Sequence, residues 1–466
     1  MKFFNSSSIA LPSFLWGFIG CIVFLQQTLA IELRREPYLL AKHSHGITLR
    51  WRTDAEVRHR CVLWFGSDPS HLDQMAAASE WHHHYPGMRD WGVTLNELEP
   101  NTKYFYAIEV DYAVVIGADD AHWFQTDPAV NDSRLVRLWM LGDSGSNRPR
   151  WDISESPFGN GQLPSPILVR NGFNRFNRDR SLDGIILLGD NAYPLGTDRQ
   201  YQAAFFNVYR DLLRNTPILP CVGNHDMDDA YPYVFRLNTT EADLGPQSRY
   251  PYYYSQDIGN VHIVVLDPWK LWLESTTDVN YPDWQKQLDW LKVDLNQNTQ
   301  DWTILVNHFP VYCAGNYDSD TNEPLKLLRE MLVPIIDQFG IDLVVAGHDH
   351  TYQRSYLIRQ HIGSRETFDP HKHRLNSAQG RPNMIYKKHG SNSGAIYVIS
   401  GTAGGSRTGN PFDHPAMVPF YNGDDHSRGI EVPGSFLLEI KDSILHGRQI
   451  DQTGRILDDF RLKKVD

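Results

Sequence analysis

Several short apolar runs in this chain stop abruptly at turns made of glycine and chemically reactive side chains. One of them, Leu343–Ala346, leads directly into Gly347-His348-Asp349-His350. A run of four to eight apolar residues bounded by turn residues is typical of a buried strand. Two histidines one residue apart are weak support for a metal site, because such a pair is more often solvated. The inference depends on whether other strands end in the same way.

Four further apolar runs do end in this way. The polar residues that follow them are Asp143 after 135–141, Asp190 and Tyr193 after 184–188, Asn224 and His225 after 218–222, and His308 after 303–306. Helices expected over 200–215, 283–295 and 323–339, the last with Pro334 inside it and Gly340 ending it, alternate with these runs. This pattern predicts an α/β unit in which the carboxyl ends of neighbouring strands converge on one site.

Length, composition and net charge indicate a folded protein of two domains that does not bind nucleic acid. A chain of 466 residues exceeds a usual single core, so we expect two domains. Its 41% hydrophobic and 21% charged residues are typical of a folded protein. The net charge of −12 argues against a nucleic-acid partner. It does not exclude a phosphorylated small-molecule substrate, because a metal site supplies positive charge locally.

The first 30 residues have the pattern of an export signal. Lys2 supplies a positive start, Leu11–Leu25 is largely apolar, and Thr28-Leu29-Ala30 is suited to cleavage. The alternative is an uncleaved membrane anchor. No other run approaches the ~20 apolar residues of a membrane span. We therefore expect a mature protein that is secreted or periplasmic, with no membrane contact after cleavage.

Residues 31–128 predict an all-β sandwich. Ile47, Leu49 and Trp51 alternate with polar residues, which is typical of a half-buried strand. The stretch from Leu98 to Tyr106 resembles the tyrosine corner of fibronectin type III domains. We interpret this domain as a support for the reaction site. A solvated loop explains His82-His83-His84 better than a metal site does.

Residues 132–466 form the second predicted domain. Its stretch from His361 to Ser393 has little periodicity and predicts a surface excursion. Residues 395–400 predict a strand ending at Gly401-Thr402-Ala403-Gly404-Gly405, and 435–464 predict paired strands. Beyond Cys21, which lies in the signal, three cysteines remain, an odd number that cannot form a disulfide framework: Cys61, Cys221 and Cys313. Both a Cys221–Cys313 pair and buried free thiols remain open.

The motifs GDSG, GDNAY, GNHD, NHFP and GHDH together resemble those of the calcineurin-like metallophosphoesterases, in particular the purple acid phosphatases. The resemblance runs from about Arg134 to the C-terminus. Gly145 stands where the wider superfamily has a histidine, and Tyr193 matches the tyrosine of purple acid phosphatases. The resemblance implies a fibronectin type III-like sandwich followed by an α/β four-layer domain, with two mixed sheets flanked by helices.

The resemblance also implies a binuclear metal centre. By position, Asp143, Tyr193 and His350 bind the first metal, Asn224, His308 and His348 bind the second, and Asp190 bridges both. The first ligand set is anionic and suits Fe(III), whereas the amide and imidazole set suits a divalent Fe, Zn or Mn ion.

The implied function is that of an exported acid phosphatase, which hydrolyses phosphomonoesters by attack of a metal-bound hydroxide. His225 is the implied acid for the leaving group, although it could instead orient a metal ligand. From Phe309 to Gly347 the chain lacks the further histidines that family members often carry. His262 and Arg354 are open candidates, although core packing and a surface salt bridge explain them as well. The alternatives are a phosphodiesterase or nucleotide pyrophosphatase, or a non-catalytic metal-stabilised binding module. Asn131 and Asn238 fit glycosylation acceptors if export is eukaryotic.

Overall fold

The computed structural model describes residues 31–54, 60–81, 87–145, 165–228, 230–237, 248–271, 284–375, 384–390, 394–407, 413–420 and 429–465. The expectations for the signal, for His82-His83-His84 and for Asn238 lie outside these residues. Among the helices described, none combines the length and the apolar composition that crossing a membrane requires.

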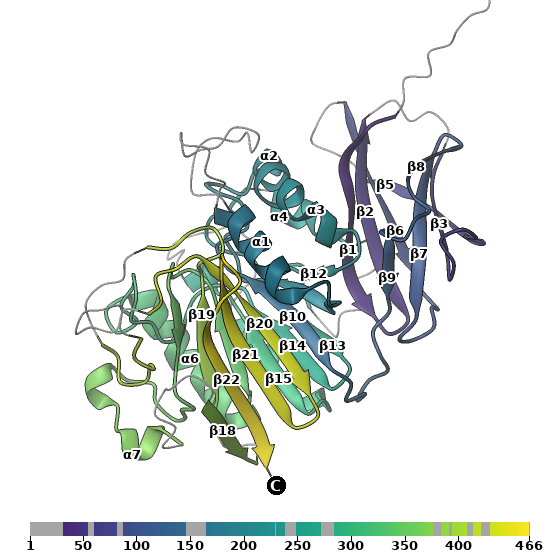
Figure 1. Cartoon of the computed structure of the whole chain (residues 1–466). Coiled ribbons are helices and arrows are strands. Elements are labelled where there is room, and N and C mark those ends of the chain that lie inside the picture. The colour runs from purple at the N-terminus through teal and green to yellow at the C-terminus, as the bar shows by residue number, and fades with distance from the viewer. Residues whose placement is uncertain are drawn as a thin grey trace, which may run out of the picture.

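The N-terminal unit is a β-sandwich with its own core (Figure 1). Its strands are β1 (Leu33–His43), β2 (Gly46–Asp54), β3 (Cys61–Gly66), β4 (Gln74–Ala77), β5 (Ser79–Trp81), β6 (Met88–Leu95), β7 (Lys103–Val110), β8 (Ala113–Gly117) and β9 (Trp123–Gln125). Ile47, Leu49 and Trp51 point into this core, as their alternation predicts. The Tyr104 hydroxyl accepts a hydrogen bond from Glu99 N–H at 3.1 Å, which fixes the start of β7 to the preceding loop.

The second unit has four layers, with two sheets packed face to face and helices on both outer faces (Figure 1). Its strands are β10 (Val136–Leu141), β11 (Gly184–Leu187), β12 (Pro217–Leu219), β13 (Tyr254–Ile258), β14 (Val261–Val265), β15 (Trp302–Val306), β16 (Leu343–Ala346), β17 (Tyr352–Arg354), β18 (Met384–His389), β19 (Ile396–Ser400), β20 (Gly434–Lys441), β21 (Ile444–Asp451) and β22 (Ile456–Val465). Along β10, Leu138 packs between the sheets, whereas Trp139 packs outward under the helices. The four-layer fold expected from the resemblance is confirmed.

The three helices that the sequence predicts are present with differences in detail, whereas the helix Ser165–Asn177 was not predicted. The helices are α1 (Ser165–Asn177), α2 (Asp198–Tyr201), the π-helical segment η1 (Gln202–Phe206), α3 (Asn207–Leu213), α4 (Ala230–Val234), α5 (Trp284–Gln297), α6 (Glu323–Phe339) and α7 (Pro370–His373), with the 3₁₀ turns η3 (Trp269–Leu271) and η4 (Arg365–Thr367). The single helix expected over 200–215 is a helical run interrupted by η1. Gly340 ends α6 in the left-handed conformation, with φ +67°.

Two expectations were wrong. The stretch 361–393 is not only a surface excursion, because its residues 384–389 form β18, which pairs with β22 at the edge of the large sheet. The strand containing Trp51 is not half-buried either. Arg50 and Arg52, on its other face, are buried as well.

The two units share one sheet. Strand β1 of the sandwich pairs in parallel with β12 through Leu39 and Leu40, giving an eleven-stranded sheet in the order β18-β22-β21-β20-β10-β11-β12-β1-β2-β6-β5. The smaller sheet of the second unit has the order β13-β14-β15-β16-β19-β17. The predicted tail strands β20, β21 and β22 form an antiparallel group beside β10. Cys61, Cys221 and Cys313 are buried free thiols.

Candidate metal centre

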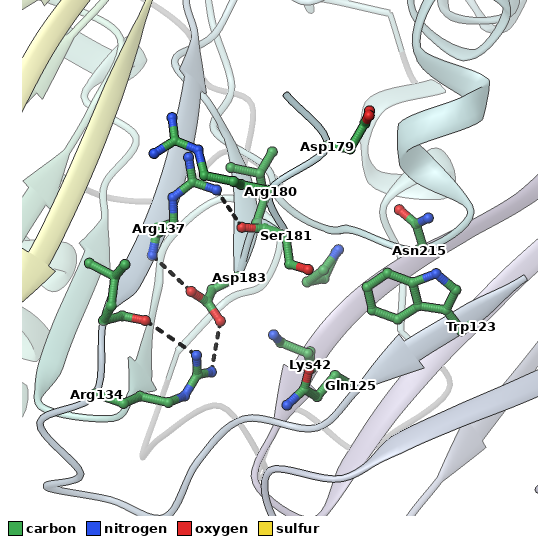
Figure 2. Close-up of a pocket in the computed structure, with 13 residues that line it drawn as sticks. Lys42, Trp123, Gln125, Arg134, Arg137, Asp179, Arg180, Ser181, Asp183 and Asn215 are labelled. Atoms are coloured by element: carbon green, nitrogen blue, oxygen red, sulfur yellow. Dashed lines mark hydrogen bonds and ion pairs between the residues drawn. The ribbon is translucent and has the colours of Figure 1, made fainter. Parts of the chain in front are cut away.

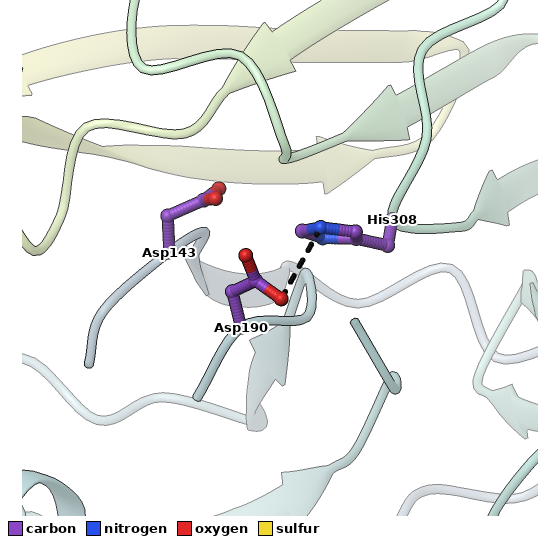
Figure 3. A group of neighbouring side chains, drawn as sticks. All are labelled: Asp143, Asp190 and His308. Carbon is purple, nitrogen blue, oxygen red and sulfur yellow. Dashed lines mark ion pairs between the residues drawn. The ribbon is translucent and has the colours of Figure 1, made fainter. Parts of the chain in front are cut away.

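The predicted polar residues meet where parallel strands of the two sheets end. Strands β10, β11 and β12 are parallel neighbours in the large sheet, and β15 and β16 are parallel neighbours in the small one. Figure 3 shows Asp143 and Asp190 on loops from the first group, facing His308 from the second. The ligand atoms of these three buried residues lie within 4.8 Å of one another. The convergence expected at the carboxyl ends of the strands is therefore present.

One group of side-chain atoms gathers around the Tyr193 hydroxyl. This oxygen lies 3.2 Å from Asp143 Oδ1, 3.0 Å from Asp190 Oδ2 and 3.2 Å from His350 Nε2. His350 Nε2 in turn lies 3.3 Å from Asp143 Oδ1. These four atoms belong to the residues that the resemblance assigns to the first metal, together with the aspartate that it assigns as a bridge.

A second group gathers around the Asn224 side-chain oxygen. Asn224 Oδ1 lies 3.0 Å from His308 Nε2 and 3.0 Å from His348 Nδ1. His308 Nε2 lies 3.4 Å from Asp190 Oδ1, the other oxygen of the same carboxylate. Asp190 thus directs one oxygen toward each group, which is the geometry a bridging ligand needs.

Unusual backbone conformations and glycines make this crowding feasible. Asp143, Asp190 and His348 have φ values of +55°, +54° and +67°, a left-handed conformation that is uncommon for residues with side chains. A Cβ on Gly401 would lie 2.7 Å from Asp143 Oδ2, and one on Gly404 would lie 2.1 Å from the Asp143 carbonyl oxygen. The glycine-rich turn after β19 therefore lets its backbone close over Asp143.

The electrostatics of the site favour a bound cation. Burial lowers the pKa of His308, but the nearby Asp190 carboxylate raises it to about 9. Burial, together with Asp190 and Asp143, raises the pKa of Tyr193 well above 10. Burial by itself raises the pKa of Asp190, yet His308 and His225 hold it below its ordinary value. Acidic oxygens packed this closely repel one another unless positive charge lies between them.

The donor atoms fit two metal ions of different character. Two carboxylates, a phenol and an imidazole make the first group hard and anionic, which suits a trivalent ion. An amide oxygen, two imidazoles and the shared carboxylate make the second group, which suits a divalent ion. The ring of His308 is held in place by its other nitrogen, since Nδ1 lies 2.7 Å from the Leu188 carbonyl oxygen. Metal binding by these residues remains a prediction.

Comparison with known proteins identifies the domain around this site. Residues 136–352 match the calcineurin-like phosphoesterase family. They form a calcineurin-like phosphoesterase domain. Among curated relatives, acid phosphatase type 7 of Danio rerio is 24% identical over 60% of this chain and 62% of the relative. Purple acid phosphatase 23 of Arabidopsis thaliana is 25% identical over 66% of this chain and 68% of the relative.

The fold also matches a solved structure. Purple acid phosphatase PPD1 from yellow lupin (Lupinus luteus) seeds aligns with a TM-score of 0.69 at 17% identity, over 92% of this chain and 74% of that chain. This likeness concerns the fold. The chain spans about three fifths of the length of the first two curated relatives, 62% and 57%.

Gly145 lies against Tyr193 in the phosphoesterase domain. A Cβ at this position would lie 2.6 Å from Tyr193 Cδ2 and 2.8 Å from Tyr193 N. Any side chain at position 145 would therefore collide with both the ring and the backbone of Tyr193, which fits the glycine found there.

Two buried aspartates support the ligand loops and were not predicted as site residues. Asp226 accepts hydrogen bonds from Gly223 N–H at 2.9 Å and from the Tyr201 hydroxyl at 2.5 Å, and burial with the nearby Asp190 raises its pKa to about 7. Asp349, whose pKa is raised by burial, accepts from Tyr317 N–H at 3.1 Å. Asp226 belongs to the motif GNHD and Asp349 to GHDH. Membership of these motifs is the sequence signal that could have identified them.

Aromatic rings cover the second ligand group. The Tyr317 ring stacks on His348 with centroids 4.2 Å apart, and Phe309 lies 4.7 Å from the same imidazole. Tyr317 belongs to the stretch in which family members often carry histidine, so an aromatic wall occupies that place in this chain.

His225 lies at the edge of the site, and the other two candidates do not. Its backbone N–H donates to Asp190 Oδ1 at 2.7 Å, and its Nδ1 lies 2.8 Å from the Pro194 carbonyl oxygen. His262 instead lies between Asp257 and Asp294, at 2.6 and 2.9 Å. Arg354 makes a fully buried ion pair with Asp458, not a surface salt bridge.

A separate cavity of about 440 Å³ opens between the sandwich and the phosphoesterase domain, near the start of β10 and so at the opposite end of that strand from Asp143 (Figure 2). Its basic side chains all have acidic partners: Lys42 pairs with Asp127 at 2.7 Å, Arg134 with Asp183 at 2.7 Å, and Arg137 and Arg180 with Glu439 at 2.7 and 3.8 Å. Because each of these cations already contacts a carboxylate, this cavity is a seam between the units rather than a second anion site.

Proposed function

We propose that this protein is an acid phosphatase of the purple acid phosphatase type, which hydrolyses phosphate monoesters at a two-metal centre. The observation that carries the proposal is the pair of converging ligand groups that share the Asp190 carboxylate. When bound, the two metal ions would supply Lewis acidity toward the phosphate and toward water. Relatives named as acid phosphatases and purple acid phosphatases support this assignment.

In this proposal each ligand residue has a defined task. Asp143, Tyr193 and His350 would hold Fe(III), whereas Asn224, His308 and His348 would hold a divalent Fe, Zn or Mn ion. The Asp190 carboxylate would be shared by the two ligand sets. No side chain of the protein needs to form a covalent bond with phosphorus, because water is the nucleophile.

His225 is the proposed proton donor to the leaving group. When Nδ1–H donates to the Pro194 carbonyl oxygen, Nε2 carries a proton only in the charged imidazolium. The P–O bond to the leaving group then breaks as its oxygen takes the Nε2 proton. Export is part of the proposal and rests on the composition of residues 1–30.

The test uses the full-length mature chain. Iron and divalent metals are quantified by mass spectrometry, the visible spectrum is recorded, and hydrolysis of p-nitrophenyl phosphate and bis-p-nitrophenyl phosphate is measured against pH. We expect two metals per chain, a visible phenolate-to-iron band, and faster release from the monoester under acidic conditions.

Tyr193→Phe is the matched variant, because it keeps the ring and removes only the hydroxyl. It should lose the visible band. Two bound metals without hydrolysis of either ester would favour a metal-stabilised binding module. Faster release from the diester would favour a phosphodiesterase.

A further inference from the structure

Three arginines of the sandwich are buried against the phosphoesterase domain. Arg50 and Arg52 lie two residues apart on one face of β2, and Arg35 of β1 is paired with Arg52 in the register of the sheet. Their exposed fractions are only 2–3%. The opposite face of β2, with Leu49 and Trp51, fills the core of the sandwich. A sandwich that served only as a spacer would not require three buried cations on the face toward its neighbour.

Two of these arginines donate hydrogen bonds to a single carboxylate of the phosphoesterase domain. Asp198 Oδ1 accepts from Arg35 Nη2 at 2.8 Å and from Arg52 Nη2 at 2.8 Å, and Oδ2 accepts from Arg52 Nη1 at 2.6 Å. Arg52 is itself held by Asp90 at 2.9 Å. Burial by itself raises the pKa of Asp198, but Arg35 and Arg52 hold it far below its ordinary range. The fork of charged hydrogen bonds fixes both the position and the orientation of this carboxylate.

Asp198 is joined to the metal centre by a short, ordered loop. It is the first residue of α2, and Thr197 and Gln200 form a capping box there. The preceding loop, from Tyr193 to Gly196, is closed by Leu195 N–H donating to Gln200 Oε1 at 3.0 Å. The position of the start of α2 therefore determines where the Tyr193 ring can lie.

The same loop contacts the second loop of the site. The Pro194 carbonyl oxygen lies 2.8 Å from His225 Nδ1, and the Leu195 carbonyl oxygen accepts from Asp228 N–H at 2.8 Å. The proposed metal ligand Tyr193 and the proposed proton donor His225 are thus linked through one stretch of backbone. Their rings lie 4.5 Å apart.

The third arginine holds the segment that follows His225. Arg50 Nη1 donates to the carbonyl oxygens of Tyr233, Val234 and Arg236 at 2.5, 3.2 and 3.2 Å, at the end of α4. The Tyr38 hydroxyl of β1 adds a hydrogen bond to the Val234 carbonyl oxygen at 2.7 Å. Both loops of the site are therefore anchored to the same pair of sandwich strands.

We propose that Arg35 and Arg52 are positioning residues of the active site, which act through Asp198 to hold the loop that carries Tyr193 and contacts His225. The kinetic consequence rests on the proposed function, whereas the order of the loop does not. In this view the sandwich fixes the distance between the phenol and the imidazole.

The experiment compares Arg52→Lys and Arg35→Lys with Arg137→Lys in the full chain. Lysine keeps the charge but cannot donate two hydrogen bonds in a fork. Arg137 is the matched control, because it is equally buried and ion-paired to Glu439 at 2.7 Å, but lies at the start of β10. Hydrogen exchange is followed in peptides covering 191–200 and 222–228, and kcat, KM and the visible band are measured on the metal-loaded proteins.

We expect exchange in both peptides to rise by about tenfold or more in Arg52→Lys, and less in Arg35→Lys, which weakens one of three contacts. Arg137→Lys should leave both peptides unchanged. We also expect kcat to fall by about 10–100-fold in Arg52→Lys with little change in KM, because a displaced group loses alignment with the reacting atoms. The visible band should shift as the phenol moves.

Unchanged exchange in both peptides would overturn the proposal, and so would unchanged kinetics in an active enzyme. If Arg52→Lys does not fold, the proposal is tested with Arg35→Lys, by hydrogen exchange in the two peptides and by the kinetics. If exchange rises as expected but the wild-type protein hydrolyses neither ester, the positioning role stands and the phosphatase assignment fails.

Discussion

Replacing Gly145 by alanine tests how tightly Tyr193 is held. The new Cβ would lie 2.6 Å from Tyr193 Cδ2 and 2.8 Å from Tyr193 N. Carbon atoms in van der Waals contact lie about 3.5–4.0 Å apart, so the ring must move by about 1 Å. It cannot simply rotate away, because its hydroxyl lies 3.0 Å from Asp190 Oδ2 and its own backbone is also too close.

Such overpacking costs about 1–3 kcal/mol of folding free energy. A displacement of about 1 Å can lower kcat by about 100-fold. Chemical denaturation measures the first effect, and steady-state kinetics with metal analysis and the visible spectrum measure the second. Ser144→Ala is the control in the same turn, because it removes an atom instead of adding one. If Gly145→Ala kept its metals, its visible band and a kcat within about threefold of wild type, the steric argument would be refuted.

Three further predictions concern other residues. Metal analysis should show that His350→Gln loses iron and the visible band while keeping divalent metal, and that His308→Gln does the reverse; equal loss of both metals would contradict separate sites. Burial lowers the pKa of His262, but two flanking carboxylates raise it to about 9, above the ordinary 6.5. The protonated His262 therefore stabilises the folded protein by at most about 3 kcal/mol, fully below pH ~6.5 and progressively less as pH rises through ~9. Urea unfolding should show this loss of stability with rising pH in the wild type but not in His262→Gln. Arg354→Met should cost about 3–5 kcal/mol, because it leaves Asp458 charged and buried, and Asp458→Asn in the same chain should recover part of that loss; no recovery would contradict the ion-pair argument.

The convergence of the candidate ligands could be anticipated because its signal is local. Each candidate ligand follows an apolar run within a few residues, and parallel strands bring their carboxyl ends to the same edge. His308 and His348 were therefore identifiable before any contact between β15 and β16 was known. The roles of Asp226 and Asp349 were not, because a carboxylate that organises a loop and one that binds a metal look alike in sequence.

The features that were missed depend on partners far away along the chain. The alternation around Arg50 and Arg52 predicts that they lie on the solvent-exposed face of a half-buried strand. Alternation reports the polarity of side chains but not whether another domain packs against them. Strand β18 was missed for a related reason. Its inward side chains include Lys388, which is buried because it pairs with Asp342 at 2.7 Å, so the apolar alternation of a strand is absent. In both cases a buried ion pair reverses the pattern that burial usually produces.

The parallel pairing of β1 with β12 changes where this protein can be divided. A cut near residue 130 follows the change in sequence pattern, but it separates Leu39 and Leu40 from Pro217 and Ile218 in the middle of a sheet. The phosphoesterase domain would then present β12 as an open edge, with unpaired backbone groups ready to associate with other chains. A truncated domain is therefore expected to aggregate during expression, whereas supplying the sandwich as a separate polypeptide should restore solubility. The unit to express and engineer is accordingly the pair of domains together.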